Sequence, residues 1–369
     1  MSERKLATIR RVSEVHDIPN KDRIGLAHID GWTVIVQKSD IHAGDLVVFC
    51  EIDSVLPDAE WCSFLKDHRI RTMKMAGCLS QGIAFPLSIL PDAWPMMVKE
   101  GDDVTDMLGI TKLERPDAED VRELPKATSK KKFPKWLLRL LRKPLFAKLF
   151  GRYFSRRTRE GFPSFVSKTD ETRIQNAPWM LDKDQLWVVT EKVDGTSGTF
   201  AIRQNGTRFG KKRYEYYVCS RNRRILDDDG SIYYAVFQKY KLDEVLLQMI
   251  KNYKVEWVCI QGECIGPRVQ GNKYKLTDPQ LLAFNLITSD VGRWSSQDGC
   301  AELYTYGVPW VPILGAEKLP KTVEGMLEKA HGPSEVNAEV MREGLVCRTM
   351  DGQMSFKAVD PEFLIHYGE

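Results

Sequence analysis

Alternating hydrophobic and polar residues dominate the first 110 or so positions of the chain. Short runs such as Trp32–Val36 and Asp45–Phe49 have the period of two that is typical of half-buried strands. Turn signals at Asp30–Gly31 and Ala43–Gly44 separate these runs. The pattern predicts a small antiparallel barrel, and an OB-type barrel is one candidate. Such barrels commonly bind oligonucleotides, although many bind other ligands or only support a neighbouring domain.

The second half of the chain has a mixed pattern. Strand-like runs such as Leu186–Val189 alternate there with two or three helical stretches, including Asp243–Tyr253 and Val323–Ala330. This alternation predicts a mixed, largely antiparallel domain. The expected fold class is therefore α+β, with a small N-terminal β-barrel followed by a larger mixed domain.

Charge is distributed unevenly between these regions. Residues 126–159 contain 13 Lys or Arg and no Asp or Glu, and removing them from the net charge of +3 leaves −10 on the remainder. We therefore divide the chain into an OB-like barrel at 1–115, a basic linker at 116–160 and a second domain at 161–369. A basic segment on an otherwise acidic chain predicts a polyanionic partner, either nucleic acid or a membrane surface.

The basic segment has helical amphipathic spacing over Trp136–Lys143 before Pro144 interrupts it. Three interpretations compete: a solvated linker helix, a phosphate-binding arm and a membrane-surface helix. We favour a linker that contacts a nucleic-acid backbone and rank membrane contact last.

Other features narrow the class of protein. No apolar run approaches the roughly 20 residues of a spanning helix, and the N-terminus has no hydrophobic leader, so an intracellular, cytoplasmic protein is expected. The 8 cysteines form no CxxC pair, and the closest two are Cys259 and Cys264. We expect reduced core cysteines and no zinc site. Nothing resembles a dimerising heptad stretch, so a monomer is expected.

The sharpest local motif is Thr190–Ser197, which closes the predicted strand at Leu186–Val189. It places Lys192 at a strand end beside the turn at Gly195. A lysine amine can attack phosphorus only when neutral, which requires burial, nearby cations or a metal ion. Asp194 lies two residues on, and thus on the same face if the strand continues. Alone, a Lys-x-Asp-Gly tetrapeptide is also compatible with an exposed lysine and a turn aspartate.

Further motifs follow in an order that resembles the covalent nucleotidyltransferases, which include RNA ligases, DNA ligases and capping enzymes. Lys192–Gly195 resembles motif I of that superfamily, and Ser220–Asn222 resembles the next motif. Gln261–Glu263 with Gly266 resembles motif III, and Phe284–Asn285 resembles motif IIIa. Glu343–Val346 resembles motif IV, and Ser355–Lys357 resembles motif V. Chance explains any one match but hardly the ordered set.

The resemblance implies roles for the matched side chains. Lys192 would carry the nucleotide, and Lys357 would hold its phosphate as charge develops. Phe284 would stack on adenine, Glu191 would read the adenine edge, and Arg221 would contact ribose or phosphate. Taken alone, Phe284 would be interpreted as an ordinary core residue.

The resemblance also implies a metal ion. Asp194, Glu263 and Glu343 resemble the acids that hold Mg²⁺ (or Mn²⁺), mostly through its waters, and hard cations favour such oxygen ligands. Without the motifs, each acid would be interpreted as an ordinary surface charge. Some relatives carry a second motif V lysine where this chain has Val359.

The order of the domains indicates which ligase is resembled. DNA ligases and capping enzymes place an OB-type domain after motif V, whereas 12 residues follow Lys357 here. The barrel precedes the nucleotidyltransferase (ATP-grasp-like ligase) domain instead, as in ATP-dependent RNA ligases with an N-terminal OB domain. In that family Arg173, within Lys168–Asn176, would lie near the nucleotide or the 5′-phosphate, although this segment could also simply cap the domain.

The implied function is sealing of RNA 3′-hydroxyl and 5′-phosphate ends with ATP through a lysyl-AMP intermediate, at breaks in RNA-containing duplexes during RNA repair. One alternative is a DNA ligase or capping-type nucleotidyltransferase. Another is a catalytically silent nucleic-acid-binding scaffold, against which the intact Lys192, Glu263, Glu343 and Lys357 argue.

Overall fold

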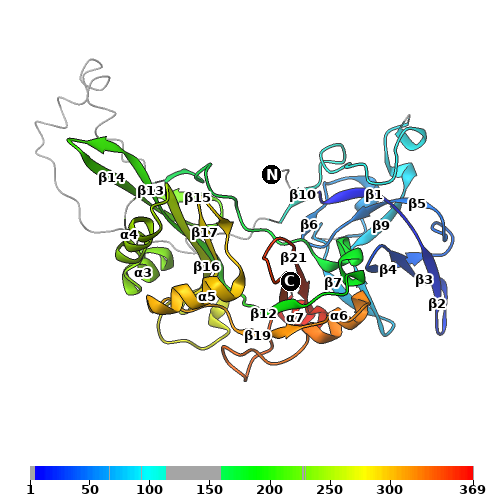
Figure 1. The fold of residues 1–369 in the computed structure, drawn as a ribbon. Coiled ribbons are helices and arrows are strands. Elements are labelled where there is room, and N and C mark those ends of the chain that lie inside the picture. The colour runs from blue at the N-terminus through cyan, green and yellow to red at the C-terminus, as the bar shows by residue number, and fades with distance from the viewer. Residues whose placement is uncertain are drawn as a thin grey trace, which may run out of the picture. The chain divides into compact units, whose positions relative to one another are not determined.

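The computed structural model describes residues 5–65, 67–92, 94–113, 159–226, 228 and 230–368. These residues form two compact units (Figure 1). The first draws on Met1–Arg115, Asp170–Asp194 and Val311–Glu369, and the second on Pro116–Thr169 and Gly195–Trp310. The helix expected at 136–143 lies outside the described residues.

The N-terminal barrel of the first unit is built from short antiparallel strands (blue and cyan in Figure 1). One sheet has the order β1-β5-β9, a second has the order β2-β3-β4, and two pairs, β7-β8 and β10-β6, complete the barrel. The elements are β1 (Ala7–Arg11), β2 (Glu14–Ile18), β3 (Lys21–Ile29), β4 (Trp32–Gln37), β5 (Leu46–Cys50), β6 (Ser54–Val55), η1 (Glu60–Cys62), β7 (Thr72–Met75), β8 (Cys78–Gln81), β9 (Ile83–Pro86), η2 (Leu87–Ile89), η3 (Trp94–Met96) and β10 (Thr111–Lys112). The strands predicted at 32–36 and 45–49 are confirmed as β4 and β5.

The barrel core follows from the alternation along its strands. On β4, Trp32, Val34 and Val36 are buried while the residues between them are partly exposed. They pack in one hydrophobic cluster that also contains Phe49 of β5 and, from the other end of the chain, Phe363. Removing this apolar surface from water is the main force that holds such a barrel together.

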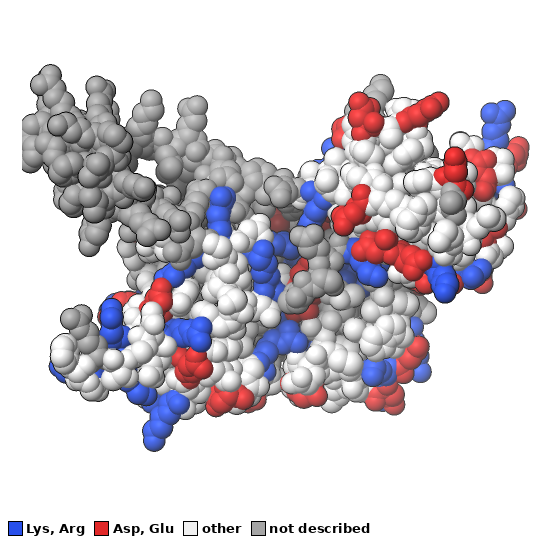
Figure 2. Space-filling model, turned by 90° about the horizontal axis from the view of Figure 1, so that it is seen from above, with Lys and Arg blue, Asp and Glu red and all other residues white. Residues whose placement is uncertain are grey.

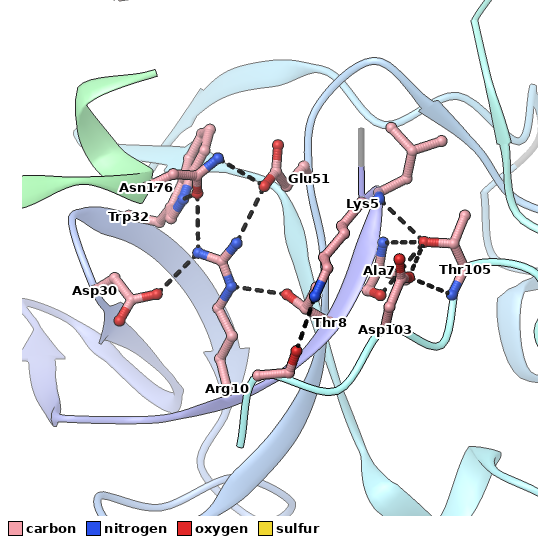
Figure 3. Close-up of polar contacts among 12 residues, drawn as sticks. Lys5, Ala7, Thr8, Arg10, Asp30, Trp32, Glu51, Asp103, Thr105 and Asn176 are labelled. Atoms are coloured by element: carbon pink, nitrogen blue, oxygen red, sulfur yellow. Dashed lines mark hydrogen bonds and ion pairs between the residues drawn. The ribbon is translucent and has the colours of Figure 1, made fainter. Parts of the chain in front are cut away.

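A polar network joins the barrel to the short helix η4 (Ile174–Asn176), as Figure 3 shows. The guanidinium of Arg10 donates hydrogen bonds to Asp30 Oδ2 at 2.8 Å, Asn176 Oδ1 at 2.9 Å and Glu51 Oε1 at 3.1 Å. Asn176 also accepts from Trp32 Nε1 at 2.7 Å and donates to Glu51 at 2.8 Å. Glu51 is buried, and these hydrogen bonds offset the free-energy cost of removing its carboxylate from water.

The rest of the first unit is a four-stranded antiparallel sheet of order β19-β12-β20-β21. Its elements are η4, η5 (Pro178–Asp182), β12 (Trp187–Lys192), β19 (Ile313–Glu317), α6 (Val323–Ala330), β20 (Gly344–Thr349), β21 (Ser355–Val359) and α7 (Pro361–Tyr367). The helix predicted at 323–330 is confirmed as α6, whose first turn is capped by the Thr322 hydroxyl accepting from the Gly325 amide.

The second unit is a seven-stranded antiparallel sheet of order β11-β15-β14-β13-β16-β17-β18. Its elements are β11 (Arg159–Gly161), β13 (Thr196–Arg208), β14 (Lys211–Cys219), β15 (Arg223–Ile225), α3 (Ile232–Lys239), α4 (Leu242–Tyr253), β16 (Trp257–Ile265), η6 (Gln270–Asn272), β17 (Gln280–Thr288), β18 (Gly292–Arg293) and α5 (Ser296–Thr305). The predicted helix at 243–253 is confirmed as α4.

The expected number of helices was too low, because α3, α5 and α7 were not foreseen. Helix α3 is rich in aromatic residues and α5 contains Gly299, so neither has a strong local helical preference. Gly299 faces Trp310 so closely that an added Cβ would come within 2.8 Å of the ring. The formation of α3 and α5 therefore depends on tertiary packing and not on local sequence preference. The predicted α+β class with an N-terminal barrel and a mixed, largely antiparallel remainder is confirmed.

Two further sequence expectations concern helices and cysteines. Every helix in the described part of the chain is too short or too polar to cross a lipid bilayer. All cysteines are free thiols, and six of them are buried, as expected for reduced core residues.

Candidate active site

The lysine of the first motif lies at the end of a strand, facing an acid from the neighbouring strand. Lys192 is the last residue of β12 and pairs with Gly344 of β20. Its Nζ lies 2.5 Å from Oε2 of Glu343, and the two side chains are 26% and 10% exposed. The amine is therefore within direct proton-transfer distance of a carboxylate that is mostly removed from water.

Gly344 is required for this arrangement. Its φ of +156° is rare for residues with a side chain, and an added Cβ would overlap the carbonyl oxygen of Ala358 on β21. Any larger residue would push β20 away from β21 and move Glu343 with it. Gly344 therefore serves the close approach of two strands.

Lys357 lies on β21, opposite Val346 of β20, on the same sheet as Lys192. Its Nζ forms an ion pair with Asp170 Oδ1 at 3.1 Å. Its backbone amide donates to the carbonyl oxygen of Thr172 at 2.8 Å, so the segment before η4 runs along the edge of β21. That segment also contains Arg173, which is buried and donates to Asp53 of the barrel at 3.1 Å.

Glu191 is 1% exposed, and both of its carboxylate oxygens accept hydrogen bonds from one loop. Ser334 Oγ donates to Oε1 at 2.5 Å, and the Glu335 amide donates to Oε2 at 2.8 Å. Burial raises the pKa of the Glu191 carboxyl, and the two hydrogen bonds lower it in part. The sequence offered no indication of Ser334, which lies 143 positions along the chain from Glu191.

Asp194 follows β12 and is buried. The strand ends at Lys192 and the chain turns at Gly195 into β13, so the strand does not continue through Asp194. An added Cβ on Gly195 would come within 2.6 Å of the carbonyl oxygen of Cys264, which confirms the need for glycine at this bend.

Glu263 and Phe284 lie on adjacent strands of the second unit. Glu263 on β16 faces Ser197 on β13. On β17 the register shifts, because Gln261 pairs with Asn285 while the next residue, Gly262, pairs with Ala283. Phe284 is the extra residue of this β-bulge. A bulge redirects a side chain out of the regular alternation and is common beside functional sites.

Two buried amides hold this bulge. Asn285 Nδ2 donates to Gln261 Oε1 at 2.9 Å, and Gln261 Nε2 donates to the carbonyl oxygen of Ser167 at 2.9 Å. An added Cβ on Gly262 would come within 2.7 Å of the Leu282 carbonyl oxygen. The motif positions on either side of Glu263 and Phe284 thus fix the backbone geometry rather than offering chemistry themselves.

Arg221 lies in the tight turn between β14 and β15 and is exposed. The Ser220 amide donates to the Arg223 carbonyl oxygen at 3.0 Å and closes this turn. The guanidinium is therefore presented at the end of the sheet by a rigid support.

The predicted metal ligands divide between the units. Asp194 and Glu343 belong to the first unit and Glu263 to the second. Within the described ranges, no cluster of three His, Cys, Asp or Glu side chains is close enough to hold a metal ion. The proposed trio consists of carboxylates, the donor type that Mg²⁺ and Mn²⁺ favour, and it stays a prediction.

Solved structures of one enzyme resemble this chain over nearly its full length. A glutamate-to-alanine variant of the Naegleria gruberi RNA ligase with ATP and Mn is 29% identical, covers 99% of this chain and 100% of its own, and superposes with a TM-score of 0.80. The same ligase with PPi is 29% identical with a TM-score of 0.78, covering 99% of both chains. A lysine-to-methionine variant with AMP and Mn is 29% identical with a TM-score of 0.78, covering 98% and 99%.

Family comparisons agree with these structures. Residues 6–87 match an OB-fold domain and residues 185–359 match the RNA ligase family. A comparison with curated proteins produced no match. The fold is thus that of an ATP-dependent nucleotidyltransferase of the ligase class. Residues 185–359 thus form an RNA ligase domain with an OB-fold domain ahead of it, which confirms the resemblance seen in the sequence.

Proposed function

We propose that this ligase seals RNA 3′-hydroxyl and 5′-phosphate ends with ATP, through AMP linked to Lys192. The observation that carries the proposal is the pairing of the Lys192 amine with the Glu343 carboxylate at 2.5 Å, on the sheet that also presents Lys357. The Naegleria gruberi ligase has been solved with ATP, with AMP and with PPi, which are the substrate and products that such a step would use.

In the first step, Lys192 Nζ attacks the α-phosphorus of ATP. An N–P bond forms while the P–O bond to pyrophosphate breaks, and the pyrophosphate leaves with the bonding electrons. The amine must lose protons to do this, and Glu343 is the acceptor within reach. Lys357, oriented by Asp170, provides positive charge for the phosphate oxygens.

Two further displacements complete the reaction. The AMP passes from Lys192 to the RNA 5′-phosphate, and the 3′-hydroxyl then displaces AMP to form the phosphodiester. Splitting one difficult condensation into easier displacements is the advantage of covalent catalysis.

Four further side chains would bind the nucleotide. Phe284, oriented by its bulge, would stack on the adenine, and Arg221 would contact ribose or phosphate. Arg173 would lie near the nucleotide or the 5′-phosphate. Glu191 would read the adenine edge, since a carboxylate has about four lone-pair sites and two accept the bonds from Ser334 and Glu335.

Asp194, Glu263 and Glu343 would hold Mg²⁺ or Mn²⁺. A bound divalent ion supplies positive charge that favours the neutral amine and withdraws electrons from phosphorus. The carboxylates supply hard oxygen ligands for it, directly or through water.

The proposed setting is repair of breaks in RNA-containing duplexes by an intracellular monomer. The basic residues of 126–159, of which 126–158 lie outside the described residues, would contact the RNA backbone. The domain boundaries at residues 115 and 161 belong to the same proposal.

The decisive experiment incubates the nucleotide-free protein with α-labelled ATP and a divalent metal, and compares wild type with Lys192→Ala. An acid-stable label on wild type alone is expected. Sealing is then measured with RNA and DNA ends in duplex and single-stranded form, which separates an RNA ligase from a DNA ligase. Labelling by GTP alone would indicate a capping-type enzyme. No labelling by either nucleotide would favour the catalytically silent nucleic-acid-binding scaffold.

A further inference from the structure

The hairpin of β13 and β14 extends beyond the sheet of the second unit (Figure 1). Strand β13 pairs with β16 only over residues 196–203, whereas its pairing with β14 continues to Arg208 and Lys211. The hairpin beyond residue 203 is therefore a two-stranded arm within the described part of the chain. Asn205, Lys211 and Lys212 are exposed accordingly.

The tip of this arm is strongly basic. Its sequence from Thr207 to Arg213 contains four Lys or Arg and no Asp or Glu. Lys211, Lys212 and Arg213 are exposed, and none of them forms an ion pair within the part of the chain that the structure describes. The acids at the base of the arm are already paired, since Glu215 binds Arg224 at 2.8 Å and Glu256 binds Arg203 at 2.6 Å. Positive charge at the tip is thus left for an external anion.

Phe209 occupies the turn of the arm and is 92% exposed. Phe209 and Gly210 both have positive φ, +51° and +76°, as a two-residue type I′ turn requires. Asn-Gly is the preferred pair for such a turn, and a bulky aromatic residue at the first position is strained. The turn therefore does not favour phenylalanine at this place, and the exposed ring is accessible to a ligand with a flat face.

We propose that residues 209–213 form an RNA-binding arm, in which Lys211, Lys212 and Arg213 contact phosphates and Phe209 stacks on an unpaired base. An aromatic ring among cations is the combination used for single-stranded nucleic acid, because stacking tolerates every base and phosphates supply the charge. The proposal rests on RNA being the substrate, as proposed above. By contrast, the face of the N-terminal barrel seen in Figure 2 (at the right) shows more acidic than basic side chains, and acidic side chains repel phosphates.

The test measures binding of a single-stranded, 5′-phosphorylated RNA oligonucleotide by the full chain over a range of salt concentrations. The variants are Lys211→Ala with Lys212→Ala, and Phe209→Asn. The matched control is Lys251→Ala with Lys254→Ala, which removes two exposed lysines from the α4 region of the same unit. The double arm variant should lower the slope of log affinity against log salt by about 1.4, since each phosphate contact contributes about 0.7.

Phe209→Asn separates binding from folding. Asn-Gly suits the turn, so the urea midpoint should stay the same or rise, while the RNA dissociation constant should increase at least about fivefold through lost stacking. Labelling of Lys192 by ATP should be unchanged in every arm variant. If the wild-type protein is not labelled by ATP, the proposed function is overturned. The comparison of RNA binding between the arm variants and wild type would still decide the role of the arm.

Wild-type RNA affinity and salt slope in the arm variants would overturn the proposal. An equal loss in the Lys251/Lys254 control would also overturn it, because the effect would then reflect the overall charge. Retained RNA binding together with lost sedimentation on phosphatidylserine vesicles would assign the arm to a membrane surface instead.

Discussion

Lys192 and Glu343 come from adjacent antiparallel strands, and Nζ of the first lies 2.5 Å from Oε2 of the second. The two residues are 151 positions apart in the sequence. Strand pairing, with Lys192 opposite Gly344, is what brings them together, so the distance is set by the sheet and not by flexible loops. The acid is thereby preorganised to take a proton from the attacking amine.

Glu343→Gln should slow formation of the labelled lysine about 100-fold, because the amide keeps the shape but cannot accept the proton. The measurement is a single-turnover time course with α-labelled ATP. Glu317→Gln is the matched control, since Glu317 pairs with Lys329 at 3.0 Å elsewhere on the same unit and should label at the wild-type rate. A wild-type rate for Glu343→Gln would remove Glu343 from the proton transfer.

Glu191 predicts a pH dependence of stability. Its pKa is raised in the fold by burial, so its contribution to stability is fully present below the pKa of the unfolded chain and is lost as pH rises through the folded pKa. Glu191→Gln, which cannot ionise, should therefore gain stability relative to wild type between about pH 4 and about pH 7. Urea unfolding at both pH values measures this gain, and the exposed Glu256→Gln variant is the control. A difference that stays constant with pH would contradict the prediction.

Phe284→Leu should weaken ATP binding by about 1 to 3 kcal/mol, the usual value of one base stacked on an aromatic ring. Phe284→Tyr keeps the ring and should bind ATP nearly as wild type. Both affinities can be measured by calorimetry on Lys192→Ala protein, which prevents turnover. Equal affinity of the leucine and tyrosine variants would show that the ring does not stack on the base.

Gly344→Ala should destabilise the fold by about 2 kcal/mol or more, because the added methyl group overlaps the Ala358 carbonyl and the backbone has positive φ. The free energy of unfolding in urea gives the value. Gly161→Ala is the control, since its added Cβ meets no atom within 4 Å. Similar stability of the two variants would mean that β20 and β21 can separate without cost.

The sequence predicted the parts of the fold that carry strong periodicity. Strands β4 and β5 alternate cleanly, and α4 and α6 have clear apolar faces, so their places were found. Helix α7 was missed because it is short and starts at Pro361 directly after β21. Its formation depends on the Asp360 cap and on burial of Phe363 against distant residues, which local pattern does not reveal.

The sequence likewise predicted only part of the candidate site. The ordered motifs indicated Lys192, Glu343 and Lys357, but not the side chains that orient them. Asp170 lies 187 positions from Lys357, and Ser334 lies 143 positions from Glu191. Such pairings follow from strand order and loop packing, which a single sequence does not contain. The assigned roles and the domain boundaries stay predictions.

Helix α7 buries Phe363 and Leu364 in the core of the barrel whose first strand begins at Ala7. The barrel strands are translated long before α7, yet α7 fills part of their core. A nascent chain would expose that part of the core until α7 emerges from the ribosome, so folding of the barrel stays incomplete up to that point. For the same reason, a chimera that exchanges the N-terminal domain with that of another ligase must exchange residues 361–367 as well.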